Sequence, residues 1–136
     1  MVIEARNGED ILDSGMKHIC FAVNTEGKND SGFAGYVSRH FWPELEHIGP
    51  CEMGTSMTLD HDGIFFHALV CHSIENGWRN PAMVVRKCFD DLDTNDPVAS
   101  VAIGTSIDGL LSGASFTAIE EGMQDSAKNI ILFKYN

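Results

Sequence analysis

The sequence predicts an α/β protein, a three-layer α/β/α sandwich with a mixed, mostly parallel sheet. β-rich apolar runs alternate with amphipathic helical stretches in the order β-β-α-β-β-α-β-α-β. Helical stretches between strands imply parallel crossovers, whereas one Asp-Gly pair between two β-rich runs implies an antiparallel hairpin. The 136 residues, 43% of them hydrophobic, fit one domain over residues 1–136 that buries a genuine core.

Strands are predicted where β-branched, aromatic and other apolar residues cluster between turn signals. The predicted strands are residues 2–6, 17–23, 55–59, 64–71, 98–103 and 129–135. The first strand alternates and ends at Asn7-Gly8, and the second has the profile of a buried strand. The hairpin turn is predicted at Asp60 to Gly63, between the third and fourth strands.

Three helices are predicted between these strands. The first is capped by Asp30 or Ser31 and extends to about His47, with a break or kink at Pro43 inside it. The second begins at Pro81, where proline suits the first turn, and has apolar residues at helical spacing as far as Leu92. The third follows Gly113 and places Phe116, Ile119 and Met123 on one face.

The charge balance disfavours some classes of partner. Nine Lys and Arg against 20 Asp and Glu give a net charge of −11, which repels nucleic acid phosphates. No apolar run approaches the roughly 20 residues that cross a membrane, and the start lacks the apolar region of a secretion signal. We therefore expect a cytoplasmic protein with no nucleic acid or membrane partner. A small anion remains compatible, because backbone N–H groups can bind phosphate without Lys or Arg.

Cysteine and histidine spacing gives little support for a metal. No two of the four cysteines form a C-x-x-C pair, and reduced, partly buried thiols are expected. His67, Cys71 and His72 are close in sequence, but residues 67 and 71 face one side of a strand and residue 72 the other. No metal and no cofactor are therefore predicted.

Two loops have a composition suited to phosphate. One is Asn24 to Gly35, before the first helix, and the other is Gly104 to Gly109, after the strand at 98–103. Glycines let backbone N–H groups approach a diphosphate, and Thr105 and Ser106 add hydroxyl donors. Tight turning alone explains such loops equally well. The chain has no Walker A motif and no G-x-G-x-x-G after the first strand, which disfavours P-loop ATP hydrolysis and a dinucleotide oxidoreductase.

In combination, these pieces resemble the macro domain family of ADP-ribose-binding sandwiches over nearly the whole chain. Gly8-Glu9-Asp10-Ile11 is similar to the family's Gly-Asp-Ile, and Val23-Asn24 to its Val-Asn. Gly32-Phe33-Ala34-Gly35 is similar to its glycine-rich helix entry, and Ile103 to Leu110 to its second phosphate loop. The resemblance implies a ligand: ADP-ribose, a relative of it, or an ADP-ribosylated protein.

The branch most similar to the chain is that of the terminal ADP-ribose protein glycohydrolases, which remove ADP-ribose from acidic side chains. Gly104-x-x-Ile107-Asp108-x-Leu110 fits its pattern, as does Ile119-Glu120-Glu121. In that branch, catalysis uses an Asp in this loop and a Lys at the end of a strand. The resemblance puts Asp108 at the Asp position and His72 at the Lys position, where an imidazole can act as a base or a weak nucleophile.

Each candidate residue has an ordinary structural alternative. Asp10 binds adenine or caps a turn, Asn24 binds a ribose hydroxyl or closes a loop, and Phe33 packs on the sugar or on the core. Asp108 polarises the anomeric centre or serves a turn, and His72 is catalytic or a surface imidazole. The candidates are catalytic Asp108 and His72, with Asp10, Ile11, Asn24, Gly32, Phe33, Ala34, Gly104, Thr105, Ser106, Ile107, Gly109 and Leu110 for the ligand.

Three functions stay open at this point. The chain is a reader that holds ADP-ribose, a hydrolase of ADP-ribosyl esters, or an interaction protein that keeps the fold without the ligand site. The sequence does not specify an oligomeric state.

Overall fold

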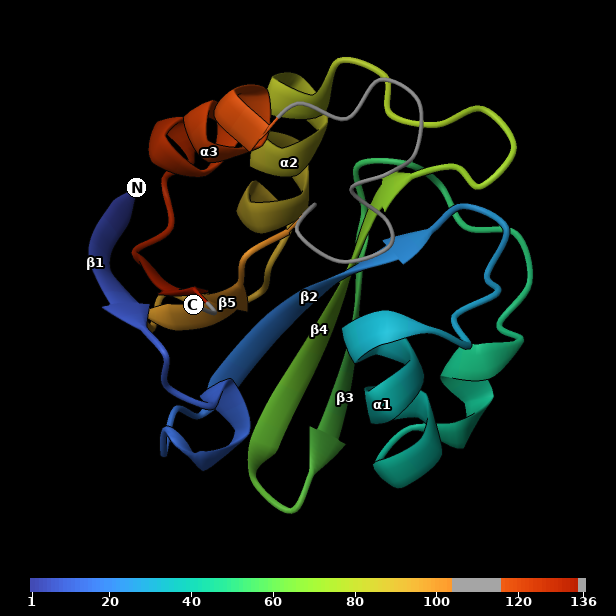
Figure 1. Cartoon of the computed structure of the whole chain (residues 1–136), viewed down its shortest axis with the longest axis horizontal. Coiled ribbons are helices and arrows are strands. Elements are labelled where there is room, and N and C mark those ends of the chain that lie inside the picture. The colour runs from blue at the N-terminus through green and yellow to red at the C-terminus, as the bar shows by residue number, and fades with distance from the viewer. Residues whose placement is uncertain (104–115, 135–136) are drawn as a thin grey trace.

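The computed structural model describes residues 1–103 and 116–134, and within them the strand order of the sheet is β1-β6-β5-β2-β4-β3 (Figure 1). The strands are β1 (Val2–Asn7), β2 (His18–Asn24), β3 (Ser56–His61), β4 (Ile64–His72), β5 (Val98–Val101) and β6 (Ile130–Lys134). All neighbouring pairs are parallel except β3 and β4. The predicted mixed, mostly parallel sheet is confirmed.

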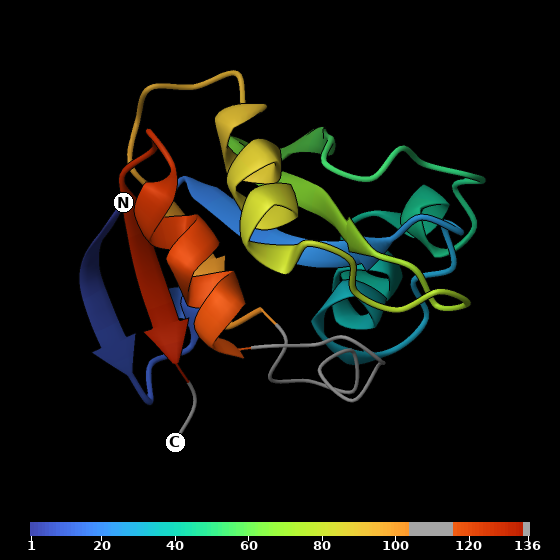
Figure 2. The same cartoon turned by 90° about the horizontal axis from the view of Figure 1, so that it is seen from above.

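Helices cover both faces of this sheet (Figures 1 and 2). Helix α1 (Gly32–His40) and the short helices η1 (Ile11–Asp13) and η2 (Pro43–Glu46) pack on one face, while α2 (Pro81–Asp90) and α3 (Phe116–Asp125) pack on the other. The predicted three-layer sandwich is therefore confirmed. Among the described residues, no helix combines the length and apolar character needed to cross a bilayer.

Two hydrophobic clusters, one on each face, join the layers. Phe21 and Phe66 belong to the cluster under α1, and Leu69 and Phe89 to the cluster under α2 and α3. Alternation along β2 and β4 makes this possible, because successive side chains point to opposite faces of a strand. Full burial of Phe89 contributes strongly, since truncating such a side chain to Ala costs about 3–5 kcal/mol.

Helix α1 is shorter than predicted. It ends at His40, and Pro43 then begins η2 in place of continuing the helix to His47. A proline ring in a helix interior removes a hydrogen bond and clashes with the preceding turn, so the predicted break at Pro43 is confirmed. Helix η2 still buries Leu45 completely.

The hairpin between β3 and β4 turns where the Asp-Gly pair predicts it. Asp62 and Gly63 have φ values of 52° and 87°, and both central residues of a type I′ turn require a positive φ. The side chain of Asp60 accepts a hydrogen bond from the backbone N–H of Gly63 at 2.9 Å. Strand β5 is shorter than predicted and ends at Val101, two residues before Ile103.

Candidate functional site

Five parallel strands, β1, β2, β4, β5 and β6, end at the same edge of the sheet, which we call the carboxyl edge. In open α/β sheets, ligands bind outside this edge, where loops lead to helix N-termini. Asp10 lies in the segment after β1, Asn24 is the last residue of β2 and His72 is the last residue of β4. The pairing of β2 with β4 brings together Asn24 and His72, which lie 48 positions apart in the sequence.

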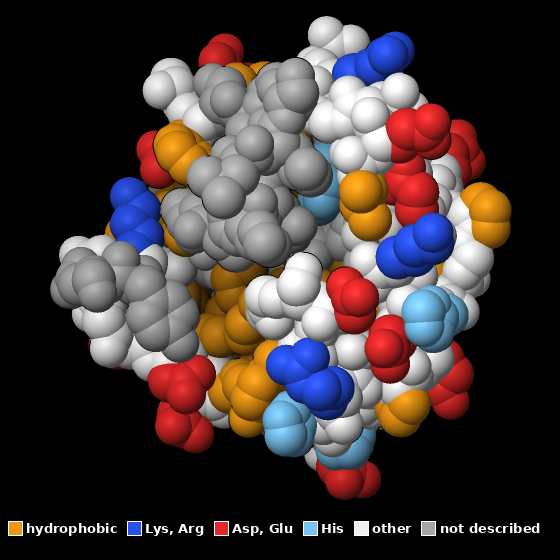
Figure 3. All heavy atoms as spheres, turned by 45° about the vertical axis from the view of Figure 1, so that its right-hand side comes forward, with side chains coloured by type: hydrophobic (Ala, Val, Ile, Leu, Met, Phe, Trp, Pro, Cys, Tyr) orange, Lys and Arg blue, Asp and Glu red, His pale blue; other side chains and the backbone are white. Residues whose placement is uncertain are grey.

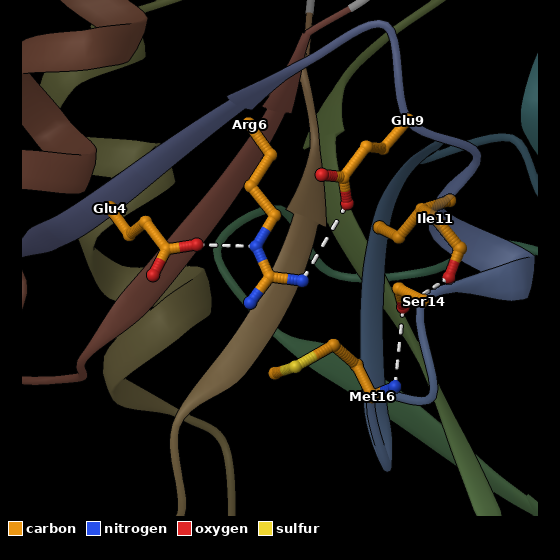
Figure 4. Close-up of polar contacts among 6 residues, drawn as sticks. All are labelled: Glu4, Arg6, Glu9, Ile11, Ser14 and Met16. Atoms are coloured by element: carbon orange, nitrogen blue, oxygen red, sulfur yellow. Dashed lines mark hydrogen bonds and ion pairs between the residues drawn. The ribbon is translucent and has the colours of Figure 1, made fainter.

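Asp10 follows β1 and caps η1. Its side chain accepts a hydrogen bond from the backbone N–H of Leu12 at 3.0 Å, which confirms the capping alternative, and the residue is exposed to solvent. Its neighbour Ile11 is 2% exposed and packs in the cluster under α1. Ser14 donates to the carbonyl of Ile11 at 2.6 Å and fixes the short helix (Figure 4). Adenine recognition by Asp10 stays a prediction.

Arg6 stands beside this segment (Figure 4). Its guanidinium hydrogen-bonds Glu4, lies 3.7 Å from the carboxylate of Glu9, and sits 5.4 Å from the ring centre of Phe133. The hydrogen bond to Glu4 raises the pKa of the guanidinium. Arg6 thus ties β1 to the residues that lead into η1.

Asn24 organises the loop between β2 and α1. Its amide nitrogen donates to the carbonyl of Lys28 at 2.7 Å, and its amide oxygen accepts from the N–H of Lys28 at 3.0 Å. These bonds confirm the loop-closing alternative for this buried side chain. Asn29, which the sequence analysis did not single out, is also buried and donates to the carbonyl of Leu45 at 2.9 Å. The contact of Asn24 with ribose stays a prediction.

The loop enters α1 through its glycine-rich segment. Gly32 has a φ of 62°, and a Cβ on Gly35 would lie 2.6 Å from the carbonyl carbon of Asp30. Glycine at position 35 is therefore needed for the loop to return this closely. Ser31 is the N-cap residue, but its side chain makes no capping hydrogen bond to the helix. The hydroxyl of Ser31 therefore accepts no hydrogen bond from the first N–H groups of α1.

Phe33 is half-buried, and its ring centre lies 5.6 Å from that of Phe21. The packing alternative for Phe33 is confirmed. The next residue, Ala34, is 6% exposed and belongs to the same cluster. These residues hold the first turn of α1 on the sheet.

His72 ends β4 and is fully buried, so the surface alternative is wrong. The pairing of β2 with β4 shifts between Val23 and Asn24, so that Asn24 pairs with His72 rather than with Cys71. Such a bulge re-aims the side chains that follow it. The imidazole stacks on Trp78, with ring centres 4.9 Å apart and planes 23° apart.

Glu26 also belongs to the carboxyl edge and had no signal in the sequence, because its partners follow it by 47 and 48 positions. Its carboxylate accepts hydrogen bonds from the hydroxyl of Ser73 at 2.6 Å and from the N–H of Ile74 at 2.8 Å. Burial raises the pKa of Glu26, but these hydrogen bonds outweigh burial and lower it to about 2. The carboxylate is therefore ionised at neutral pH.

The second phosphate loop lies outside the described residues. This concerns candidate residues Gly104, Thr105, Ser106, Ile107, Asp108, Gly109 and Leu110. Ile103, directly before them, is 5% exposed and packs with α2 and α3.

No metal site is formed within residues 1–103 and 116–134, where no group of three His, Cys, Asp or Glu side chains has a suitable arrangement. The four cysteines all lie in these ranges and form no disulfide with one another. The thiols of Cys71 and Cys88 are 4.0 Å apart in the core.

On the face seen in Figure 3, Lys and Arg side chains are interspersed with Asp and Glu side chains.

No family model matches the sequence, and no curated protein matches it. Solved structures do match. The macrodomain of Mycobacterium tuberculosis DarG aligns with a TM-score of 0.69 and 13% identity over 98% of each chain. The Trypanosoma brucei macrodomain in complex with ADP-ribose aligns with a TM-score of 0.63 and 19% identity, over 96% of this chain and 62% of that one.

Alphavirus P23pro-zbd aligns with a TM-score of 0.66 and 15% identity over 96% of this chain. The alignment covers 21% of the viral chain, so this chain spans about a fifth of its length. These likenesses extend over 96–98% of this chain, although the sequence identity is only 13–19%. The protein therefore has the macrodomain fold.

Proposed function

We propose that this protein binds ADP-ribose or a close derivative at the carboxyl edge of its sheet. The observation that carries the proposal is the first turn of α1, which begins at this edge with N–H groups that Ser31 does not cap. A helix N-terminus of this kind attracts a diphosphate through its N–H groups and its dipole. The Trypanosoma brucei macrodomain, which shares the fold, is known in complex with ADP-ribose.

In this proposal, the diphosphate lies against Gly32, Phe33 and Ala34, and the exposed carboxylate of Asp10 accepts from the adenine amino group. Asn24, at the end of β2, closes the loop that leads from β2 to α1. Because Gly104 to Leu110 resemble the family's second phosphate loop, we propose that this segment also contributes to ligand binding. Backbone donors suit a chain with a net charge of −11.

The test is isothermal titration of the wild type, Ser31→Asp and Ser31→Ala with ADP-ribose, with AMP, ATP and NAD as competing ligands. Aspartate caps helices well, so Ser31→Asp leaves the fold intact or stabilises it by roughly 0.5–1 kcal/mol. Its charge also repels a diphosphate, so the affinity for ADP-ribose falls at least about tenfold. Ser31→Ala retains the wild-type affinity. No heat with the wild type at millimolar ADP-ribose would favour an interaction protein without a ligand site.

We further propose that Asp108 confers removal of ADP-ribose from acidic side chains. The support is the resemblance of its loop to that of the glycohydrolase branch. His72 is fully buried against Trp78, so packing is the role we propose for its imidazole in place of catalysis. An ADP-ribosyl-glutamate peptide tests this: Asp108→Asn should bind ADP-ribose but release none from the peptide. A wild type that binds without turnover would be a reader.

A further inference from the structure

Glu26 connects the two loops that follow β2 and β4. Its carboxylate accepts from the hydroxyl of Thr25 at 3.1 Å within its own loop. From the other loop it accepts from the hydroxyl of Ser73 at 2.6 Å and from the N–H groups of Ile74 at 2.8 Å and Glu75 at 3.4 Å. Consecutive N–H groups with a nearby hydroxyl form a small anion-binding site, and here the carboxylate of Glu26 is the anion.

The turn that Glu26 binds is short and closed. Ser73 and Gly77 exchange backbone hydrogen bonds of 3.0 Å and 2.8 Å, and the N–H of Asn76 donates to the hydroxyl of Ser73 at 2.9 Å. Trp78 follows at once and stacks on His72. The Ser73–Gly77 turn therefore leads directly into Trp78, which is buried in the cluster under α2 and α3.

The same turn is connected to the loop that leads into α1. The N–H of Thr25 donates to the carbonyl of His72 at 2.9 Å, so the two loops leave the sheet side by side. Beyond that bond, Glu26 provides the side-chain connection between them. A displaced Ser73–Gly77 turn would change the shape of the carboxyl edge, where the proposed ligand binds.

We propose that Glu26 is a positioning residue for ADP-ribose: its carboxylate holds the Ser73–Gly77 turn and the β2–α1 loop in the arrangement that binds the ligand. This inference rests on the proposed function. Because the carboxylate of Glu26 already occupies the N–H groups of the turn, the diphosphate of the ligand would bind at the N-terminus of α1 and not at the turn.

The experiment compares the wild type with Glu26→Ala, Glu26→Gln and Glu75→Gln. Hydrogen exchange of the Ile74 and Glu75 amides reports on the turn, and titration with ADP-ribose reports on the site. Glu26→Ala should speed exchange at both amides at least tenfold and raise the Kd about tenfold. Glu26→Gln keeps the shape and one acceptor oxygen but lacks the charge, so it should fall between Glu26→Ala and the wild type. Glu75→Gln removes the same charge from an exposed side chain of the turn and should match the wild type in both measurements.

Either of two results overturns the positioning role: unchanged exchange in Glu26→Ala, or faster exchange with an unchanged Kd. If Glu26→Ala does not fold, Glu26→Gln supplies the comparison by the same criteria. A wild type that does not bind ADP-ribose refutes the proposed function and the positioning role together. Faster exchange in Glu26→Ala would then still show the connection between the loops, so the two failures are distinguishable.

Discussion

Acidification should destabilise this protein through a buried histidine pair far from the carboxyl edge. His67 lies in β4, is 3% exposed, and shares a 2.9 Å hydrogen bond with His18 and a 2.8 Å hydrogen bond with Thr58. Burial, and to a lesser degree the charge of His18, lower the pKa of His67 from 6.5 to about 4. Between about pH 4 and pH 6.5, His67 therefore binds a proton in the unfolded chain but not in the folded chain.

The sign and size of the effect follow from linkage. Between the unfolded pKa of 6.5 and the folded pKa of about 4, the unfolded state holds more protons, so stability falls as the pH falls. At about pH 5, the unfolded His67 is almost fully protonated and the folded one about a tenth protonated. The free energy of unfolding at about pH 5 is then about 2 kcal/mol lower than at about pH 8. Other titrating groups add their own pH dependence, so the comparison needs a variant.

The assay is urea unfolding at about pH 8 and pH 5 for the wild type, His67→Gln and His47→Gln. Glutamine offers a donor and an acceptor to His18 and Thr58 but does not titrate. The fall in unfolding free energy should be about 2 kcal/mol smaller in His67→Gln than in the wild type. The side chain of His47 is 77% exposed, so His47→Gln should show the same fall in unfolding free energy as the wild type. If the unfolding free energy falls equally in His67→Gln and in the wild type, the buried His67 is not the cause of the acid destabilisation.

Two further predictions test close backbone approaches. In Gly122→Ala, the new Cβ would lie 2.3 Å from the carbonyl oxygen of Ala82, so α3 must move off α2. The overpacking outweighs the roughly 1 kcal/mol gain in helix propensity, and urea unfolding should show a net loss of about 1–2 kcal/mol. The exposed Glu121→Ala should change stability by less than about 0.5 kcal/mol, and a stabilised Gly122→Ala would contradict this packing. In Gly35→Ala, the new Cβ would push against the backbone of Asp30, which should destabilise the fold and weaken ADP-ribose binding. Thermal melts and titration with ADP-ribose measure the two effects. Wild-type values in both would contradict the close approach of the loop to α1.

Much of the fold could be predicted because its signals are local. The Asp62-Gly63 turn, the break at Pro43 and the order of strands and helices all follow from residue types within a few positions. The end of α1 at His40 differs from the prediction, because the apolar spacing continues into η2, where Leu45 is also buried. Pro43 therefore ends the regular helix, while apolar spacing alone does not show where the break falls.

The candidate site was less accessible to sequence reasoning. The local roles of Asp10 and Asn24 are predictable, because Asx side chains cap helices and close loops through neighbouring residues. The role of Glu26 depends on Ser73 and Ile74, and no local pattern marks such a distant contact. His72 is buried with its imidazole stacked on Trp78, and no local sequence pattern marks that contact.

The central claim is that ADP-ribose binds at the carboxyl edge, and the most direct measurement is a backbone amide NMR titration of the uniformly labelled protein. ADP-ribose should shift the amides of Gly32, Phe33 and Ala34 and those of the Ser73–Gly77 turn, and leave the hairpin at Asp62 and Gly63, at the opposite edge, unchanged. Absence of shifts at the carboxyl edge at saturating ADP-ribose, or shifts confined to the hairpin, would contradict the account.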